Sequence, residues 1–224
     1  MRFRNQNVIV TGASRGLGLS LSRHFAAEGA RVVMVARRVG PLEEAVAQAK
    51  EVGEAHALPA DVGAPDAAAE IAGVHNASTL GPVPLRPLAE TSDADFDAAF
   101  AVNLAGPFRL TRAVVGSMIA RQTGVVLHVS SDAAVDAYPT WGAYGASKAA
   151  LDHLSRVWAA ELHGTGVRVL AVDPGEMDTR MHADAIPDAD PASLRDPDAV
   201  AAGVVALLAR SPRSGARVQV EVAS

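Results

Sequence analysis

The sequence predicts an α/β protein with one domain, built on a doubly wound parallel β-sheet that carries helices on both faces. Two observations lead to this fold class. Short runs of β-branched residues alternate with Ala-rich stretches of helical length along the whole chain. Strands separated in this way need right-handed crossovers, which pair them in parallel. The 224 residues contain no internal repeat and no linker, so we expect a single domain over residues 1–224.

The first half of the chain supplies three strands and two helices. Strands are expected where β-branched residues cluster, at residues 7–11, 31–36 and 55–58. Helices are expected between them, at residues 17–28 and 41–51. Gly29 is placed to end the first helix, and Pro41 suits the first turn of the second.

The second half continues the alternation. Helices are expected at residues 96–121, with a bend near Pro107, and at residues 142–163 and 198–210. Strands are expected at residues 124–130, 167–172 and 217–222. The Pro- and Asp-rich residues 186–197 are expected to form a loop.

The interval between Asp61 and Asn76 is short for this fold. A crossover between parallel strands takes about a dozen residues or more. Residues 66–72 leave room for under two helical turns, and residues 73–75 leave a strand of about three residues. Either this strand is truncated, or the chain as given lacks a segment.

Composition excludes several classes of protein. The net charge of −5 comes from both signs spread along the chain, so nucleic acid is not expected as a partner. Without cysteine there are no disulfides and no thiolate metal sites, and the histidines lack metal-ligand spacing. No stretch approaches the roughly 18 apolar residues of a membrane span, and the N-terminus does not resemble a signal peptide. We expect a cytoplasmic protein without a metal.

A Gly-rich turn follows the first expected strand. Residues 11–18 read TGASRGLG and lead into a helix. Glycine lets the backbone approach a pyrophosphate, and the helix N-terminus favours its charge. The turn is not a P-loop, because no Gly-Lys-Ser/Thr follows; a turn without a ligand is the alternative. The expected cofactor contacts here are Gly12, Ser14, Arg15, Gly16, Leu17 and Gly18.

The end of the second strand indicates which dinucleotide binds. An acidic residue at this point binds a ribose 2′-hydroxyl, whereas arginine accommodates a 2′-phosphate. Here the sequence has Arg37 and Arg38, and Arg15 adds a positive charge nearby. A guanidinium group suits bidentate phosphate contact. We therefore expect NADP(H) rather than NAD(H), the alternative being that these arginines are solvated loop charges.

Four residues form a candidate catalytic set. Tyr144 and Lys148 are four residues apart, so they share one face of the expected helix. Ser131 follows a strand at the carboxyl edge of the sheet, where ligands bind in such folds. Asn103 lies between helical segments before that strand. A free tyrosine titrates near 10, and a nearby ammonium group lowers that pKa.

These motifs, in this order, resemble the short-chain dehydrogenase/reductase family with its Rossmann fold. The matching segments are TGASRGLG (11–18), DV (61–62), NA (76–77), VNLAG around Asn103, SS (130–131), YGASK (144–148) and DPGEMDT (173–179). The resemblance implies that Tyr144 is the general acid in reduction and the base in oxidation, and that Ser131 holds the substrate oxygen. It implies that Lys148 lowers the tyrosine pKa and binds the nicotinamide ribose, and that Asn103 positions a water molecule.

The resemblance also implies further cofactor contacts. Asp61 and Val62 match a pair that contacts adenine, and Asn76-Ala77 matches part of a family turn, with His75 and Ser78 as departures. The nicotinamide end would be held by Pro174, Gly175, Met177 and Thr179. The alternative for each is ordinary turn chemistry.

The substrate is the least specified part. Expected pocket walls are Asp132, Tyr138, Trp141, Glu176 and His182, under a short lid at about residues 180–197. The acidic walls favour a polar or amine-bearing small molecule, unless these are solvated loop charges. The expected activity is hydride transfer between NADP(H) and a carbonyl or alcohol, in a homodimer or homotetramer. The alternative is an NADP(H)-binding sensor or scaffold without turnover.

Overall fold

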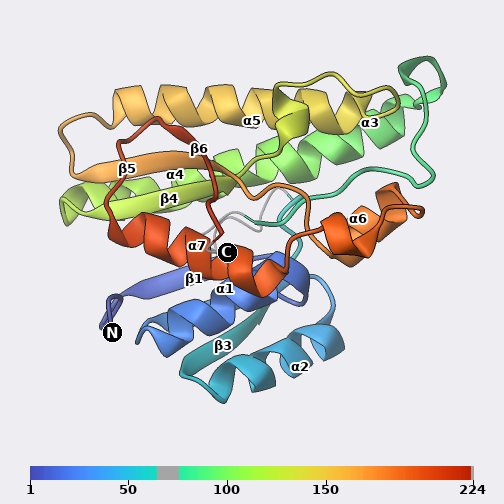
Figure 1. Cartoon of the computed structure of the whole chain (residues 1–224). Helices are drawn as coiled ribbons and strands as arrows, with labels where there is room; N and C mark the ends of the chain where they lie inside the picture. The colour runs from blue at the N-terminus through green and yellow to red at the C-terminus, as the bar shows by residue number, and fades with distance from the viewer. Residues whose placement is uncertain (65–75, 223–224) are drawn as a thin grey trace.

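In the computed structural model, which describes residues 1–64 and 76–222, strands and helices alternate as expected (Figure 1). The strands are β1 (Asn7–Thr11), β2 (Arg31–Ala36), β3 (Glu54–Pro59), β4 (Gly124–Val129), β5 (Val167–Asp173) and β6 (Arg217–Gln219). The helices are α1 (Gly16–Ala27), α2 (Val39–Lys50), α3 (Asp93–Phe100), α4 (Gly106–Ala120), α5 (Gly142–Glu161), α6 (Arg180–Ala185) and α7 (Pro197–Ala209).

All pairing between named strands is parallel, which confirms the predicted fold class. Among the described residues the strands form two three-stranded sheets, in the orders β1-β2-β3 and β4-β5-β6. In-register pairs such as Ile9–Val33 and Leu127–Leu170 run along each ladder. The predicted helix at residues 66–72 and strand at 73–75 lie outside the described residues.

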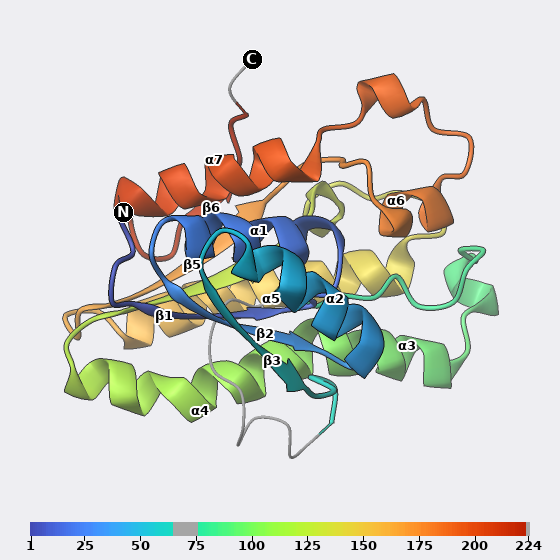
Figure 2. The same ribbon diagram turned by 90° about the horizontal axis from the view of Figure 1, so that it is seen from below.

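Helices cover both faces of the strands, as the sequence predicts. Figure 2 shows α1 and α7 on one side and α4 on the other. Alternate residues of one strand enter different cores, because side chains on a strand point to opposite faces. Met34 packs in the core under α1 and α7, while the next residue, Val35, packs with Leu110 of α4. The larger core includes Leu127 of β4 as well, so it joins the two sheets.

The helical run through Asn103 differs from the prediction. The sequence predicts a helical run over residues 96–121 with a bend near Pro107. It also predicts that Asn103 lies between helical segments, which the structure confirms. The structure has a π-helical turn at Ala101–Ala105 between α3 and α4, and Pro107 sits in the first turn of α4, where proline is tolerated. A π turn adds one residue to the helix and often marks a functional position. Asn103 is buried within it.

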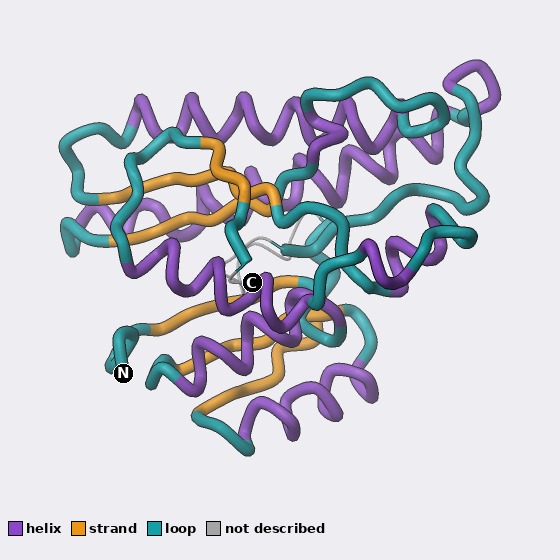
Figure 3. Tube along the Cα trace, in the orientation of Figure 1, coloured by secondary structure: helices purple, strands orange, loops and turns teal. Residues whose placement is uncertain are grey.

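Two segments near the C-terminal end also differ from the prediction. The strand predicted at residues 217–222 is shorter in the structure, where β6 spans Arg217–Gln219. The predicted loop 186–197 contains a 3-10 turn at Pro191–Ser193. Loops and short turns collect at the carboxyl ends of the strands (Figure 3). Within residues 1–64 and 76–222, no helix has the length and apolarity to cross a membrane.

Candidate functional site

One large cavity lies at the carboxyl edge of both sheets. Its volume is about 1160 Å³, enough for a dinucleotide together with a small substrate. Residues that follow β1, β2, β3, β4 and β5 all line it, because parallel strands end at the same edge. The predicted site residues on its wall are Gly12, Ser14, Arg15, Gly16, Leu17, Arg37, Arg38, Asp61, Val62, Asn76, Ala77, Ser131, Asp132, Tyr138, Trp141, Tyr144, Lys148, Pro174, Gly175, Glu176, Met177, Thr179 and His182.

The Gly-rich turn has the shape that the sequence predicts. Gly12 and Gly16 have φ of +64° and +52°, a conformation that favours glycine. A Cβ on Gly18 would collide with the Gly12 carbonyl oxygen, so this position requires glycine although it does not line the cavity. The Asn76 side chain donates to the carbonyl oxygen of Thr11 at 3.1 Å and so fixes the turn. Backbone N–H groups at the start of α1 remain available to a phosphate.

Three arginines surround the far end of the cavity. Arg15, Arg37 and Arg38 are exposed and line the wall, beside the ends of β1 and β2. Asp61 nearby uses its carboxylate to accept a hydrogen bond from the Gly63 backbone at 3.0 Å. The local charge is therefore positive, which suits a phosphate group.

Tyr144 and Lys148 project from α5 into the opposite end, and both are buried. Burial raises the pKa of Tyr144 to about 12, although hydrogen bonding with Ser131 and Ser78 opposes this rise. Burial lowers the pKa of Lys148 to about 8, and the charge of Asp152 opposes that. The Lys148 Nζ lies 5.6 Å from the centre of the Tyr144 ring and donates to the carbonyl oxygen of Val129 at 2.8 Å.

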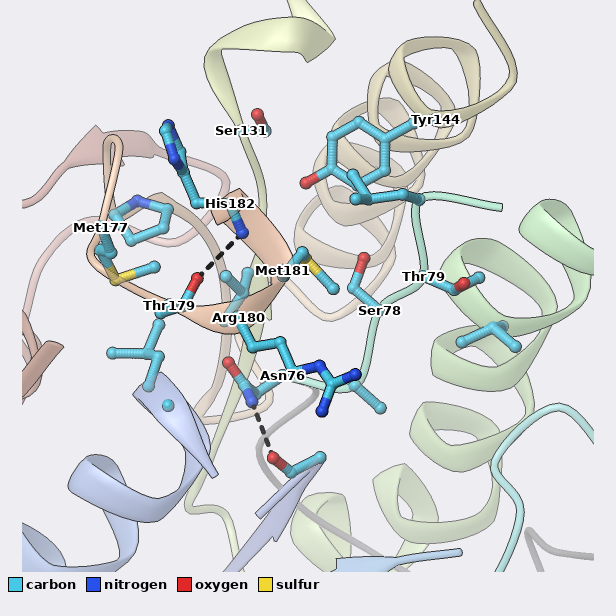
Figure 4. A pocket seen from close by; sticks show the side chains of 18 of the residues that line it. Asn76, Ser78, Thr79, Ser131, Tyr144, Met177, Thr179, Arg180, Met181 and His182 are labelled. Carbon is cyan, nitrogen blue, oxygen red and sulfur yellow. Dashed lines mark hydrogen bonds between the residues drawn. The ribbon is translucent and has the colours of Figure 1, made fainter. Parts of the chain in front are cut away.

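The hydroxyl of Tyr144 points between two serines (Figure 4). Ser131 comes from the end of β4 and donates to the Asp132 carboxylate at 2.8 Å. Ser78 comes from the segment after Asn76 and donates to the Asn103 side chain at 3.1 Å. The sequence reasoning missed Ser78 because it treated this residue as a departure from a family turn.

Asn103 is buried next to the site and does not line the cavity. Its side-chain nitrogen donates to the Thr79 carbonyl and to the Ser147 hydroxyl, both at 2.9 Å. Its oxygen accepts from Ser78 and from the Thr79 backbone. This side chain therefore ties the segment that carries Ser78 to α5. Its expected role toward a water molecule stays a prediction.

The turn after β5 closes the nicotinamide end of the predicted site. Gly175 has φ of +71°, and its N–H donates to Asp173 at 2.9 Å. Thr179 caps α6 by accepting from the His182 backbone N–H at 3.3 Å (Figure 4). Its side chain lies near Gly16. The two ends of the predicted cofactor site thus meet.

The predicted substrate walls are polar and acidic. Asp132 also accepts a hydrogen bond from the Tyr138 hydroxyl at 2.9 Å. Burial acts to raise the pKa of Asp132. Hydrogen bonds from the Ser131 and Tyr138 hydroxyls and from backbone N–H groups outweigh burial, so the pKa is lowered overall. Trp141 packs edge-on against Tyr144, and His182 Nε2 lies 3.8 Å from the Glu176 carboxylate. No cluster of three potential metal ligands occurs in the described part of the chain.

Comparison with known proteins identifies the family. The family model for short chain dehydrogenases matches residues 6–190. A short chain dehydrogenase of Pseudocercospora fijiensis is 38% identical over 81% of this chain, and the match spans only 63% of that protein's length. Galactitol 2-dehydrogenase (L-tagatose-forming) of Cereibacter sphaeroides is 36% identical over 77% of this chain and 71% of that protein.

Solved structures agree with the sequence relatives. A short chain dehydrogenase structure from Pseudomonas syringae has a TM-score of 0.89 at 29% identity, covering 98% of this chain and 96% of that one. A metagenomic short-chain oxidoreductase in complex with NADP has a TM-score of 0.81 at 32% identity, covering 99% and 98%. NAD⁺-bound xylitol dehydrogenase has a TM-score of 0.86 at 25% identity, covering 98% of each chain. The chain belongs to the short-chain dehydrogenase/reductase family, whose members are oxidoreductases that bind a nicotinamide cofactor.

Proposed function

We propose that this protein is an NADP(H)-dependent oxidoreductase that interconverts a carbonyl and an alcohol, with Tyr144 as the proton donor and acceptor. The observation that carries the proposal is the buried Tyr144 hydroxyl, which meets Ser131 and Ser78 in the wall of the same cavity that reaches the Gly-rich turn. A protein that only binds the cofactor has no need of this acid–base group beside Lys148.

The residues present fit the cofactor. A side chain at Gly18 would push into the turn that has to approach a pyrophosphate, and Arg15, Arg37 and Arg38 suit an additional phosphate. When bound, the nicotinamide gives or takes the hydride. The proposal of NADP(H) rests on the three arginines, and NAD(H) is the alternative that the Arg37→Asp variant tests.

The proton chemistry follows from the pKa of Tyr144. With its pKa raised to about 12 by burial, this group is protonated at neutral pH and can donate to the oxygen of a carbonyl that is being reduced. Alcohol oxidation needs the phenolate, which a positive charge nearby favours. Lys148 supplies such a charge on the same face of α5.

Ser131 orients the substrate oxygen. Its hydroxyl donates to Asp132 in this structure, and a hydroxyl can rotate to donate to a substrate instead. The acidic wall that Asp132 and Glu176 form, beneath the proposed lid at residues 180–197, favours a polar substrate over a fatty acyl chain. The name of the galactitol dehydrogenase relative adds sugar alcohols and ketoses to the substrates worth testing.

A substrate panel tests the proposed function. NADPH consumption is followed with aldehydes, ketones, quinones and ketoses, and NADP⁺ reduction with sugar alcohols. We expect turnover with at least one polar carbonyl. Cofactor binding without turnover across the whole panel would contradict the enzymatic proposal and favour a sensor or scaffold.

Arg37→Asp tests the cofactor preference. The change removes a cation from the cavity wall and adds a charge that repels a 2′-phosphate. One charge-assisted contact is worth about 1.5–3 kcal/mol, so we expect the KM for NADPH to rise roughly 10- to 100-fold. The KM for NADH should not rise.

Arg31→Asp is the matched control, because Arg31 is exposed at the other end of β2 and does not line the cavity. An NADPH/NADH ratio that responds equally to both variants would contradict a phosphate site at Arg37.

A further inference from the structure

Arg217, on the last strand, joins three segments that carry the proposed active site. Its Nε donates to the Asp152 carboxylate at 2.9 Å. Its terminal nitrogen donates to the Asp173 carboxylate at 3.1 Å and to the backbone carbonyl oxygen of Ser131 at 2.8 Å. The planar, fixed fork of a guanidinium group suits several acceptors at once.

Each acceptor belongs to a different part of the site. Asp152 lies one helical turn after Lys148 on the same face of α5. Asp173 ends β5 and uses its other oxygen to accept from Gly175 in the predicted nicotinamide turn. Ser131 follows β4. The three segments are far apart along the chain, and Arg217 is 86 residues from Ser131.

The guanidinium group of Arg217 compensates two buried carboxylates. The side chains of Asp152 and Asp173 are only 6% and 4% exposed, and they share Arg217 as an ion-pair partner. The second oxygen of Asp152 is buried and has no hydrogen-bond partner in the part of the chain that the structure describes. Removing one partner of a buried ion pair leaves an uncompensated charge. Here two carboxylates would be left.

These carboxylates act on the proton chemistry. The charge of Asp152 favours the protonated form of Lys148, and the charge of Asp173 favours the protonated form of Tyr144. Arg217 offsets both charges through its ion pairs. It does not line the cavity, so it acts on Tyr144 and Lys148 only through these carboxylates.

We propose that Arg217 is the positioning residue of the active site: it holds the Ser131 end of β4, the α5 helix and the turn after β5 in one arrangement, and it balances the two buried carboxylates behind them. This proposal rests on the proposed function, because it assigns Arg217 a role toward Tyr144 and Lys148.

The test compares Arg217→Met, Arg217→Lys and the double variant Asp152→Asn/Arg217→Met in the full chain. Arg168→Met is the control, because Arg168 lies in β5 and donates to a single backbone carbonyl, that of Pro212, at 3.2 Å. The readouts are kcat for alcohol oxidation as a function of pH, NADP⁺ affinity by calorimetry and the circular dichroism spectrum.

We expect Arg217→Met to lower kcat between about 10- and 100-fold, the size of loss that misplaced reacting groups cause. Its pH profile should move upward by about one unit, because the carboxylates then oppose the loss of the Tyr144 proton more strongly. Arg217→Lys keeps the charge and loses the fork, so kcat should fall without a shift of the profile. The double variant should recover part of the loss and move the profile back.

If folded Arg217→Met keeps both kcat and the pH profile of the parent protein, the proposal is wrong. If Arg217→Met does not fold, Arg217→Lys decides, and an unchanged kcat in that variant overturns the proposal. Either result leaves the proposed function intact as long as the parent protein turns over.

Discussion

Tyr144→Phe is expected to abolish most turnover while leaving cofactor binding nearly unchanged. The substitution removes the only group proposed to give and take the substrate proton, so kcat should fall about 10³-fold. Phenylalanine keeps the ring that packs edge-on against Trp141, whose centre is 5.6 Å away. Affinity for NADPH, measured by calorimetry, should therefore stay within about threefold. This corresponds to a change of less than about 1 kcal/mol in binding free energy.

The chain's second tyrosine provides the control. Tyr138 is exposed, and its hydroxyl donates to Asp132 rather than meeting Ser131 and Ser78. Tyr138→Phe removes the same atom, and we expect it to affect KM more than kcat and to retain at least about a tenth of the activity. Full activity of Tyr144→Phe, or an equal loss in both variants, would show that Tyr144 is not the proton donor.

Lys148→Met should separate activity from stability. Burial lowers the pKa of Lys148 from 10.5 to about 8, so keeping this ammonium charged at neutral pH costs about 3 kcal/mol of folding free energy. Methionine avoids this cost but leaves the Val129 carbonyl without its 2.8 Å hydrogen bond, a loss of about 1–3 kcal/mol. We expect a net gain near 1 kcal/mol, or roughly 2–4 °C in Tm, together with a loss of kcat of about 10²-fold or more.

The pH dependence of that gain has a defined sign. Between pH 8 and 10.5 the unfolded chain holds more protons than the folded one, so the stability of the parent protein rises with pH across this window. The advantage of Lys148→Met should accordingly shrink as the pH approaches 10.5. Thermal melts at pH 7 and pH 10 measure this. A change in Tm on Lys148→Met that is the same at both pH values would contradict a buried, charged Lys148.

The sequence specified the fold and most of the cavity wall because both depend on local pattern. The spacing of apolar residues predicts a helix over residues 17–28, and α1 runs from Gly16 to Ala27. The Gly-rich turn, Ser131 and Tyr144 all follow or begin regular elements, so the parallel topology brings them to one edge.

The remaining features depend on contacts between distant segments. Ser78 reaches Tyr144 through a loop whose path no periodicity predicts, and Arg217 meets Ser131 across 86 residues. The sequence predicts a bend near Pro107, but the irregular turn lies earlier, at Ala101–Ala105. The buried side-chain amide of Asn103 lies within this π turn and donates hydrogen bonds to Thr79 and Ser147.

The placement of the two tryptophans gives the molecule a built-in optical reporter. Trp141 lines the cavity beside Tyr144, whereas Trp158 packs with Phe108 between α4 and α5, in a different core cluster. Indole emits light in the range that a reduced nicotinamide absorbs, so a bound cofactor would draw excitation energy from Trp141. Trp158 does not line the cavity, so its emission should respond less than that of Trp141. Occupancy of the cavity is thereby readable from the protein's own fluorescence, whether or not a substrate is ever turned over.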